Sequence, residues 1–261
     1  MPRIKLVLEY DGTDFAGWQA QPDHRSVQGV LERALAELLG ARARVEAAGR
    51  TDAGVHAEGQ VAAFSTDREL PLKAYARGLN GLLPPDVAVV AAEEVPADFD
   101  PRRWAQGKRY RYRISNRPVR SPLRRRSAWE LFGVLDLEAM RAAAPALVGR
   151  HDFSAFRAAD CEAAHARREI RTLAIEGASS ADVTIEVEGT AFLKHMVRNI
   201  AGTLVEVGRG RRPPAWVAEV LGSKDRNRAG PTAPAHGLTL VEVLYGQGRP
   251  ARLSPVTASD E

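Results

Sequence analysis

The chain has 261 residues, of which 44% are hydrophobic, enough to build one large domain or two modest ones. No stretch approaches the run of about 18 to 20 apolar residues that a membrane span needs, and the opening MPRIKLVLEYDG lacks the layout of a signal peptide. The single cysteine, Cys161, has no internal partner for a disulfide, which suits a reducing compartment. The expected location is therefore the cytoplasm.

The formal net charge is +4, and only five of the 37 basic residues are lysines. Arginine binds phosphate through two parallel hydrogen bonds and stacks on bases, so this composition is a weak indication of nucleic acid. Three arginine clusters lie in predicted loops or at element ends, where a polyanion can reach them. Two of these clusters supply the candidate contacts to an RNA backbone, namely Arg124, Arg125, Arg126, Arg167 and Arg168.

The first hundred residues alternate between strand and helix patterns. Every second residue is apolar over 3–10, which predicts a strand. Ser26 is suited to cap a helix over 27–39, and Gly40 to end it. Further strands are expected over 42–49, 59–66 and 86–95, with a short helix over 71–83. This order is that of the split βαβ, or ferredoxin-like, arrangement, an antiparallel sheet with helices on one face.

The second half of the chain shows a similar order and predicts a second ferredoxin-like half. Strands are expected over 108–115, 168–177, 182–189 and 237–246, and helices over 136–149, 191–208 and 214–222. Pro145 interrupts the first of these helices. The predicted class is therefore α+β, with halves over 1–105 and 106–246 and a loose tail over 247–261.

Motifs for metals, cofactors and hydrolase nucleophiles are absent from the sequence. The six histidines never pair at the spacing of a helical or finger ligand set. Phosphate loops of the Walker or dinucleotide type have no match, and neither does the Gly-x-Ser-x-Gly elbow. We therefore expect neither a metal nor a cofactor.

The loop AAGRTDAGVHA, residues 47–57, is the strongest candidate for a reactive site. Gly49 and Gly54 permit a tightly shaped backbone, and Asp52 lies between them. An aspartate in a loop most often bonds only to its own backbone. Here Arg50, two residues away, would keep the carboxylate ionised and oriented, as a nucleophile or general base requires.

The stretch KRYRYRI, residues 108–114, predicts a strand with tyrosines on one side and arginines on the other. The simplest interpretation is a half-buried strand with a charged outer face. The alternative is a sheet that presents Tyr110 or Tyr112 for stacking on a base or for proton transfer. In the helix over 191–208, Lys194 and Arg198 would share one side, where like charges require an anion such as Asp52 or phosphate.

The loop AGRTDAGVHA resembles the signature of the A-type tRNA pseudouridine synthases. The resemblance extends, in the family's order, to EYDGTDFAGWQAQP, SVQGVLERAL, NGLLPPDVAVV, GKRYRYRI, HDFSAFRA, FLKHMVRNIAGTLVEVG and GLTLVEVLY. It runs from about Ile4 to Tyr245, and ordered blocks over such a length are far more specific than one motif.

The resemblance implies a homodimeric enzyme that isomerises uridine to pseudouridine at positions 38, 39 and 40 of the tRNA anticodon stem-loop. It implies Asp52 as the catalytic residue, supported by Arg50, with Tyr110 in the active site and Arg198 as the basic partner of Asp52. The two halves would place their sheets side by side, with a central active cleft between them. Family members need neither metal nor cofactor, and the target base must leave its stack.

Two other classes of protein fit part of the pattern. A non-catalytic RNA-binding protein would use the same arginines and tyrosines, but the acidic Asp52 is unhelpful in a pocket made only to bind a polyanion. A sugar-cleaving hydrolase normally needs paired carboxylates, and no convincing second one lies near the loop. The isomerase is therefore the preferred interpretation.

Overall fold

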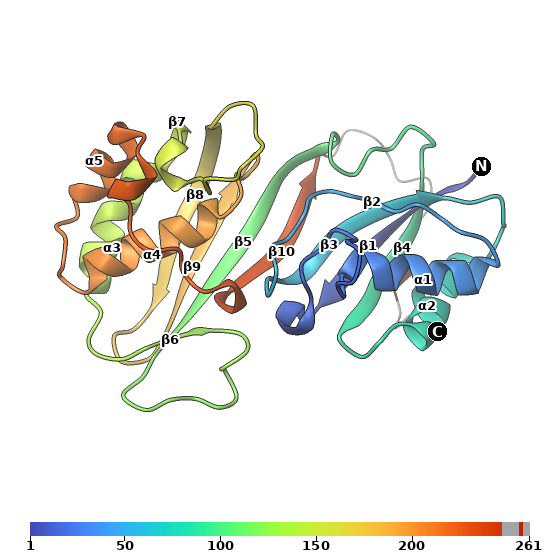
Figure 1. The fold of residues 1–261 in the computed structure, drawn as a ribbon, viewed down its shortest axis with the longest axis horizontal. Coiled ribbons are helices and arrows are strands. Elements are labelled where there is room, and N and C mark those ends of the chain that lie inside the picture. Colours follow the sequence, from blue (N-terminus) through green and yellow to red (C-terminus); the bar gives the residue numbers. More distant parts are fainter. Residues whose placement is uncertain (247–255, 258–261) are drawn as a thin grey trace. The chain divides into compact units, whose positions relative to one another are not determined.

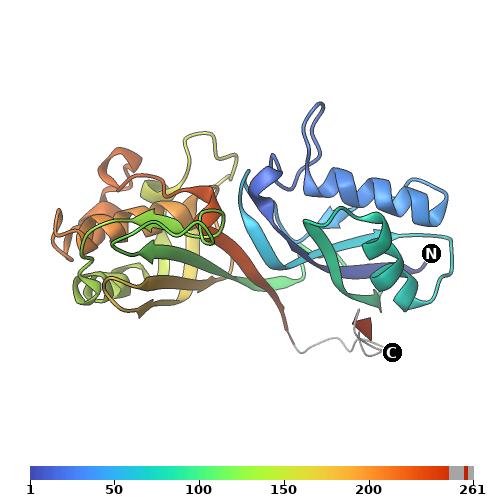
Figure 2. The ribbon, with the colours of Figure 1, turned by 90° about the horizontal axis from the view of Figure 1, so that it is seen from below.

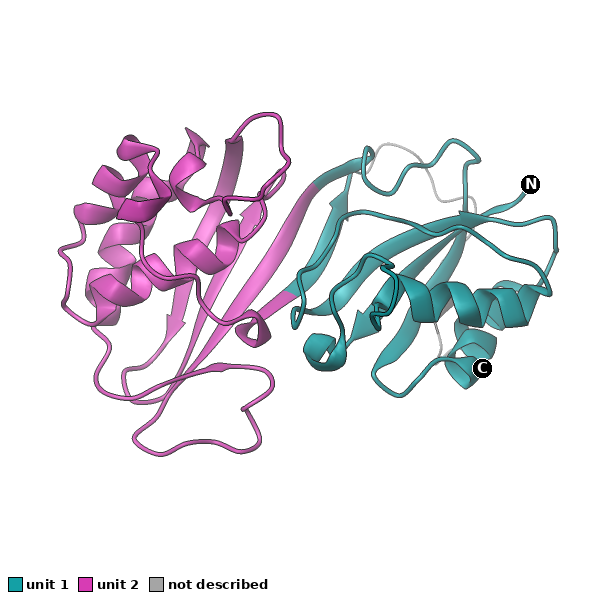
Figure 3. Ribbon diagram, viewed as in Figure 1, with its two compact units in different colours: residues 1–106, 240–261 teal, residues 107–239 magenta. Residues whose placement is uncertain are grey.

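The computed structural model describes residues 1–246 and 256–257. It contains two compact units, residues 1–106 with 240–261 and residues 107–239 (Figure 3). The last long strand, which we expected in the second half, therefore belongs to the first unit. The mixed α and β class is confirmed. The predicted tail over 247–261 lies outside the described residues, apart from Val256–Thr257.

The first unit contains β1 (Arg3–Tyr10), α1 (Val27–Leu39), β2 (Glu46–Ala47), β3 (His56–Ser65), α2 (Leu79–Leu82), β4 (Val87–Val95), β10 (Leu238–Tyr245) and β11 (Val256–Thr257). Its strand order is β11-β4-β1-β3-β10, and β2 pairs with β3 outside this path. The central strand β1 is antiparallel to both β3 and β4. Its buried residues Ile4, Leu6 and Leu8 confirm the predicted alternation.

Helix α1 lies on one face of this sheet (Figures 1 and 2). Ser26 Oγ accepts a hydrogen bond from the Gly29 N–H at 3.3 Å, and Gly40 adopts a φ of +71° at the other end. Both predicted helix boundaries are therefore confirmed. The helix expected over 71–83 is present as a π-helical turn, Ala74–Gly78, followed by α2.

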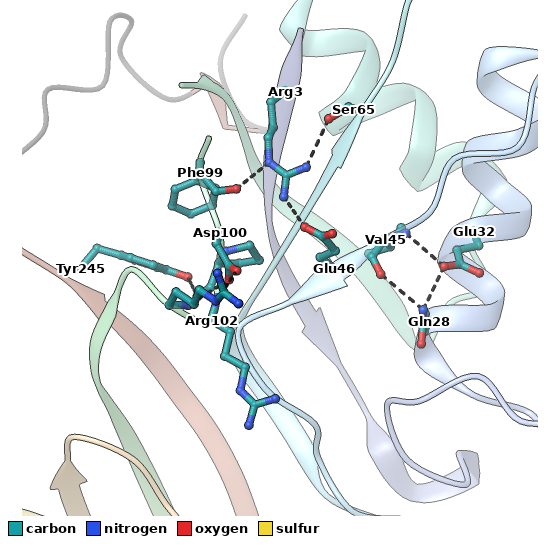
Figure 4. A network of polar contacts seen from close by, with 12 residues as sticks. Arg3, Gln28, Glu32, Val45, Glu46, Ser65, Phe99, Asp100, Arg102 and Tyr245 are labelled. Atoms are coloured by element: carbon teal, nitrogen blue, oxygen red, sulfur yellow. Dashed lines mark hydrogen bonds and ion pairs between the residues drawn. The ribbon is translucent and has the colours of Figure 1, made fainter. Parts of the chain in front are cut away.

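Strand β2 is much shorter than the strand expected over 42–49. The backbone of Val45 bonds to side chains of α1 instead of to a neighbouring strand. Glu32 Oε1 accepts from the Val45 N–H at 3.1 Å, and Gln28 Nε2 donates to the Val45 carbonyl at 3.3 Å (Figure 4). Because both groups are satisfied locally, regular pairing starts only at Glu46.

The second unit contains β5 (Ala105–Asn116), β6 (Trp129–Leu131), α3 (Leu137–Ala143), β7 (Gly149–Asp152), β8 (Arg167–Gly177), β9 (Asp182–Gly189), α4 (Met196–Gly208) and α5 (Trp216–Ser223). Its antiparallel strands follow the order β5-β9-β8-β7, and β6 pairs in parallel with β5. Helix α4 lies against this sheet (Figures 1 and 2).

Two predicted helices differ from the structure. The helix over 136–149 ends at Ala143 and tightens into a 3-10 turn, Ala144–Leu147, because Pro145 cannot donate a backbone hydrogen bond. The helix over 191–208 begins only at Met196, since His195 adopts a left-handed φ of +63°. The short strands β6 and β7 were not predicted.

Within residues 1–246 and 256–257, no helix combines the length and the apolar character needed to cross a membrane.

Candidate active site

Asp52 lies half-buried in the loop that joins β2 to β3 in the first unit. The Val55 N–H donates to the Asp52 carbonyl at 3.1 Å, which closes a turn around the aspartate. Gly54 has a φ of +77°, a conformation that glycine adopts without strain. Gly49 does not adopt a positive φ. Its carbonyl instead accepts from Gln60 Nε2 at 2.9 Å.

The segment after β1, residues 11–26, contacts the backbone of the Asp52 loop and supports it. The Trp18 N–H donates to the Thr51 carbonyl at 3.0 Å. A Cβ on Gly17, whose φ is +101°, would lie 2.7 Å from that carbonyl oxygen, and one on Gly12 would lie 2.0 Å from the Val55 oxygen. The two backbones therefore touch at positions where only glycine fits.

A buried hydroxyl pair connects the loop to β1. Tyr10 and Thr51 are 3% and 7% exposed, and their hydroxyl oxygens lie 2.8 Å apart. Gln60 Nε2 donates to the Tyr10 hydroxyl at 3.4 Å. Burial raises the pKa of Tyr10 to about 12, so the phenol keeps its proton at neutral pH. We did not predict Tyr10 and Gln60 as site residues, because only the pairing of β1 with β3 brings them to the loop.

The chain entering the loop is also held by β1. Arg3 forms an ion pair with Glu46, donates from Nη1 to Ser65 Oγ at 3.2 Å and from Nε to the Phe99 carbonyl at 2.6 Å (Figure 4). Together with the contacts of Val45 to α1, this network limits the movement of the residues that precede Asp52.

Arg50 and His56 differ in their surroundings. Arg50 is exposed, and its guanidinium makes no hydrogen bond or ion pair with another described residue. His56 is buried, and its Nδ1 accepts from the Gly12 N–H at 3.0 Å. His56 therefore holds the segment behind the loop, whereas Arg50 is accessible to a ligand.

The two tyrosines of β5 have different surroundings in the second unit. Tyr112 is fully buried, its hydroxyl donates to the Pro234 carbonyl at 2.8 Å, and burial raises its pKa. Tyr112 is therefore a core residue and is not available to stack on a base. Tyr110 packs edge to face against Phe192, with ring centroids 5.1 Å apart.

The opposite side of β5 carries arginines that pair with β9. Arg111 Nε lies 2.8 Å from Glu186, and Arg109 Nη2 lies 3.3 Å from Glu188. The simple interpretation of this side, a charged outer face, is thus the one that the structure supports.

Arg198 lies half-buried on α4, where its Nε donates to the Ala233 carbonyl at 2.8 Å. Met196, Ile200 and Leu204 on the same helix are fully buried and belong to the core. Lys194 precedes the helix and pairs with Asp160 at 2.6 Å. The predicted sharing of one helix face by Lys194 and Arg198 is therefore wrong.

Comparison with known proteins decides the family. A family model described as tRNA pseudouridine synthase matches residues 6–102 and 143–246. The chain belongs to the tRNA pseudouridine synthase family. It is therefore an isomerase, and the predicted family and enzyme class are confirmed.

Curated relatives of the synthase match along almost its whole length. A tRNA pseudouridine synthase A from Myxococcus xanthus is 68% identical over 261 residues, covering 100% of this chain and 98% of the relative. One from Geotalea uraniireducens is 51% identical over 245 residues, covering 94% and 100%. The crystal structure of the archaeal box H/ACA sRNP Nop10-Cbf5 complex is 12% identical, covers 78% of this chain and 44% of that chain, and has a TM-score of 0.36, too low to inform the fold.

The arginines predicted to contact RNA differ in how the synthase holds them. Arg124 pairs with Asp182 at 2.6 Å, whereas Arg125 and Arg126 are exposed. Arg167 is exposed as well, while Arg168 Nη1 donates to the carbonyls of His165 and Arg167 at 3.0 and 2.7 Å. The exposed members are the ones that a phosphate can reach directly from solvent.

The predicted site residues of the synthase fall in both units. Asp52 and Arg50 belong to the first unit, and Tyr110 and Arg198 to the second. Across residues 1–246 and 256–257, no group of three or more His, Cys, Asp or Glu side chains forms a potential metal site.

Proposed function

We propose that this synthase converts uridine to pseudouridine at positions 38, 39 and 40 of the tRNA anticodon stem-loop, with Asp52 as the catalytic residue. The observation that carries the proposal is the rigid support of the Asp52 loop. The neighbouring Thr51 and Val55 are buried, with 7% and 2% exposure. Asp52, which lies between them, is only half-buried and is therefore partly accessible to solvent. A pre-positioned carboxylate that substrate can reach is what attack at a ribose carbon requires.

The reaction is an internal rearrangement of one nucleotide. The bond from N1 of uracil to C1′ of ribose breaks, the uracil turns, and C5 bonds to C1′. The C5 proton is then lost and N1 gains one, so the balance closes with neither a redox partner nor an energy source. Asp52 acts at C1′, by direct attack or by assisting the departure of uracil.

The remaining candidates have supporting roles. The exposed Arg50 would hold the extruded nucleotide, a role favoured by its exposure and by the absence of an ion pair to another described residue. Tyr110 would stack on the base and accept the C5 proton. Arg198 would be the basic partner of the Asp52 carboxylate.

The family resemblance supports a finer arrangement as part of the same proposal. It comprises two ferredoxin-like halves with side-by-side sheets and a central cleft, a homodimer and a cytoplasmic location. No metal or cofactor is expected to take part.

Release of tritium from a tRNA transcript carrying 5-tritiated uridine tests the proposal. The parent should release tritium, and Asp52→Asn should release none while keeping nearly the same affinity for tRNA. Asp67→Asn is a matched control, because Asp67 is an exposed carboxylate of the same unit. Replacing uridine by cytidine at positions 38, 39 and 40 in turn assigns the sites.

The same assay distinguishes the isomerase from the non-catalytic RNA-binding protein. Tight binding of tRNA by the parent without tritium release would support the non-catalytic RNA-binding protein. Release by Asp52→Asn at the parent rate would instead remove Asp52 from the chemistry.

A further inference from the structure

Arg226 forms the centre of a polar network in the second unit. It lies in the 3-10 turn Arg226–Arg228 after α5. Its Nη1 donates to the Gly230 carbonyl at 2.9 Å, and its Nη2 donates to Asn199 Oδ1 and to Thr232 Oγ1, each at 3.0 Å. All three acceptors are neutral, so the guanidinium acts here as a hydrogen-bond donor to a folded segment and not as half of an ion pair.

Two side chains of α4 complete the network. Asn199 is fully buried, receives a hydrogen bond from Thr232 Oγ1 at 2.7 Å, and donates from Nδ2 to the Phe156 carbonyl at 2.8 Å. Thr203 lies one turn further along the helix and accepts from the Gly230 N–H at 3.0 Å. The side chains of Asn199, Thr203 and Thr232 thus each have hydrogen-bond partners within this region.

The segment 229–234, which we call the docked segment, touches the backbone of α4 directly. A Cβ on Gly202 would lie 1.8 Å from the Pro231 oxygen, and one on Gly230 would lie 2.7 Å from the Thr203 Cα. Such approaches are possible only between glycines and backbone. The docked segment therefore has one position on the helix, set by shape as well as by hydrogen bonds.

The far end of the docked segment contacts Arg198. The Ala233 N–H donates to the Arg198 carbonyl at 3.2 Å, and the Ala233 carbonyl accepts from Arg198 Nε at 2.8 Å. The next carbonyl, that of Pro234, accepts from the buried Tyr112 hydroxyl at 2.8 Å. The carbonyl that orients the Arg198 guanidinium is consequently held from both α4 and β5.

We propose that Arg226 and Thr232 are positioning residues for Arg198, acting through the docked segment and the Ala233 carbonyl. The inference rests on the proposed function, in which Arg198 is an active-site residue. An arginine side chain has several rotatable bonds, and anchoring its Nε removes much of that freedom before substrate arrives. Both Nη atoms of Arg226 are used inside the unit, which favours positioning over direct contact with RNA.

Steady-state tritium release tests the positioning role. Thr232→Val removes the hydroxyl and keeps the side-chain shape, and Thr232→Ser is the matched variant that retains the hydroxyl. We expect Thr232→Val and Arg226→Gln to lower kcat about 10-fold, with the KM for tRNA within about twofold of the parent, while Thr232→Ser stays near the parent.

A double-mutant comparison distinguishes positioning from general damage. In an Arg198→Gln background, Thr232→Val should cause no further fall in kcat, because the group being positioned is already absent. An equal fall in both backgrounds would overturn the proposal. So would a rise in KM alone, which would indicate that Arg226 binds RNA directly.

A spectroscopic measurement keeps the inference separate from the proposed function. The Nε–H of Arg198, assigned by NMR through its loss in Arg198→Lys, should exchange with water about 10-fold faster in Thr232→Val than in the parent or Thr232→Ser. Unchanged exchange would overturn the positioning role even if Arg198 proves essential. Faster exchange together with parent activity in Arg198→Gln would support positioning and count against the proposed role of Arg198.

Discussion

The hydroxyl of Tyr10 lies 2.8 Å from Oγ1 of Thr51, the residue that precedes Asp52. The two are separated by 41 positions in the chain and meet because β1 and β3 pair, with Tyr10 opposite Ala57. A bond between two neutral, buried groups therefore helps to set the position of the proposed catalytic carboxylate.

Loss of the Thr51 hydroxyl should affect both stability and turnover. Thr51→Val removes the stronger of two hydrogen bonds of the Tyr10 hydroxyl and leaves the longer one from Gln60 Nε2, so we expect a loss of about 1 to 2 kcal/mol in the free energy of unfolding. The loop would also be less well held, and kcat should fall about 10-fold. Urea unfolding and tritium release measure the two effects. Thr51→Ser, which retains the hydroxyl, should be close to the parent, and equal losses in both variants would count against the hydrogen bond.

Stability should fall at alkaline pH through Tyr10. Burial raises its pKa from 10.0 to about 12, so the folded state holds the phenolic proton more tightly than the unfolded chain does. The contribution is fully present below pH 10 and is lost as the pH rises through about 12, by up to about 3 kcal/mol. Urea midpoints of the parent and Tyr10→Phe between pH 9 and 12 should converge as the pH rises. Parallel curves would show that Tyr10 does not supply this dependence.

A methyl group at position 12 should displace the Asp52 loop. The Cβ of Gly12→Ala would lie 2.0 Å from the Val55 oxygen, a contact that the backbone must move to relieve, and we expect a cost of about 3 kcal/mol. Turnover should fall as well, because Val55 closes the turn around Asp52. Thermal unfolding and tritium release measure the two effects.

Gly222→Ala provides the control for the glycine prediction. Gly222 lies within α5, and a Cβ there meets nothing within 4 Å. This variant should gain about 0.5 to 1 kcal/mol, since alanine favours a helix over glycine. If both variants lost stability equally, steric overlap at Gly12 would not be the cause.

Affinity for tRNA should depend more on the exposed Arg125 and Arg126 than on the half-buried Arg111. Replacing Arg125 and Arg126 by glutamine should weaken binding and reduce the slope of log affinity against log salt by about 1 to 2. Arg111→Gln is the matched control, because Arg111 pairs with Glu186 at 2.8 Å, and it should leave the slope unchanged. Filter binding over a range of salt concentrations makes the comparison. An equal change in both would indicate a general effect of net charge.

Much of the fold could be predicted from patterns of neighbouring residues in the sequence. The alternation in β1, the Ser26 cap and the Gly40 stop all depend on neighbouring residues, and all three are confirmed. The late start of α4 was not predictable from its apolar spacing, because it depends on the left-handed backbone of His195. Strand β2 is short because α1 side chains bond to Val45, a contact between segments well apart in the chain.

The site shows the same division between local and long-range information. Asp52 was identified from its loop and from the ordered blocks that resemble the family, and the family match confirms that resemblance. Tyr112 was a candidate until its burial and its bond to the Pro234 carbonyl showed it to be core. Arg226 was not predicted as a site residue, because its neighbours in the sequence do not indicate its hydrogen bonds to Asn199 and Thr232.

The sequence by itself determined the family, the mixed α and β class and the loop that carries Asp52, because ordered motifs and residue periodicity are properties of neighbours along the chain. Only the tertiary structure decided which polar groups hold that loop and which hold Arg198. Hydrogen bonds and close backbone contacts depend on distances of a few ångströms between segments far apart in sequence, such as Tyr10 with Thr51 and Ala233 with Arg198.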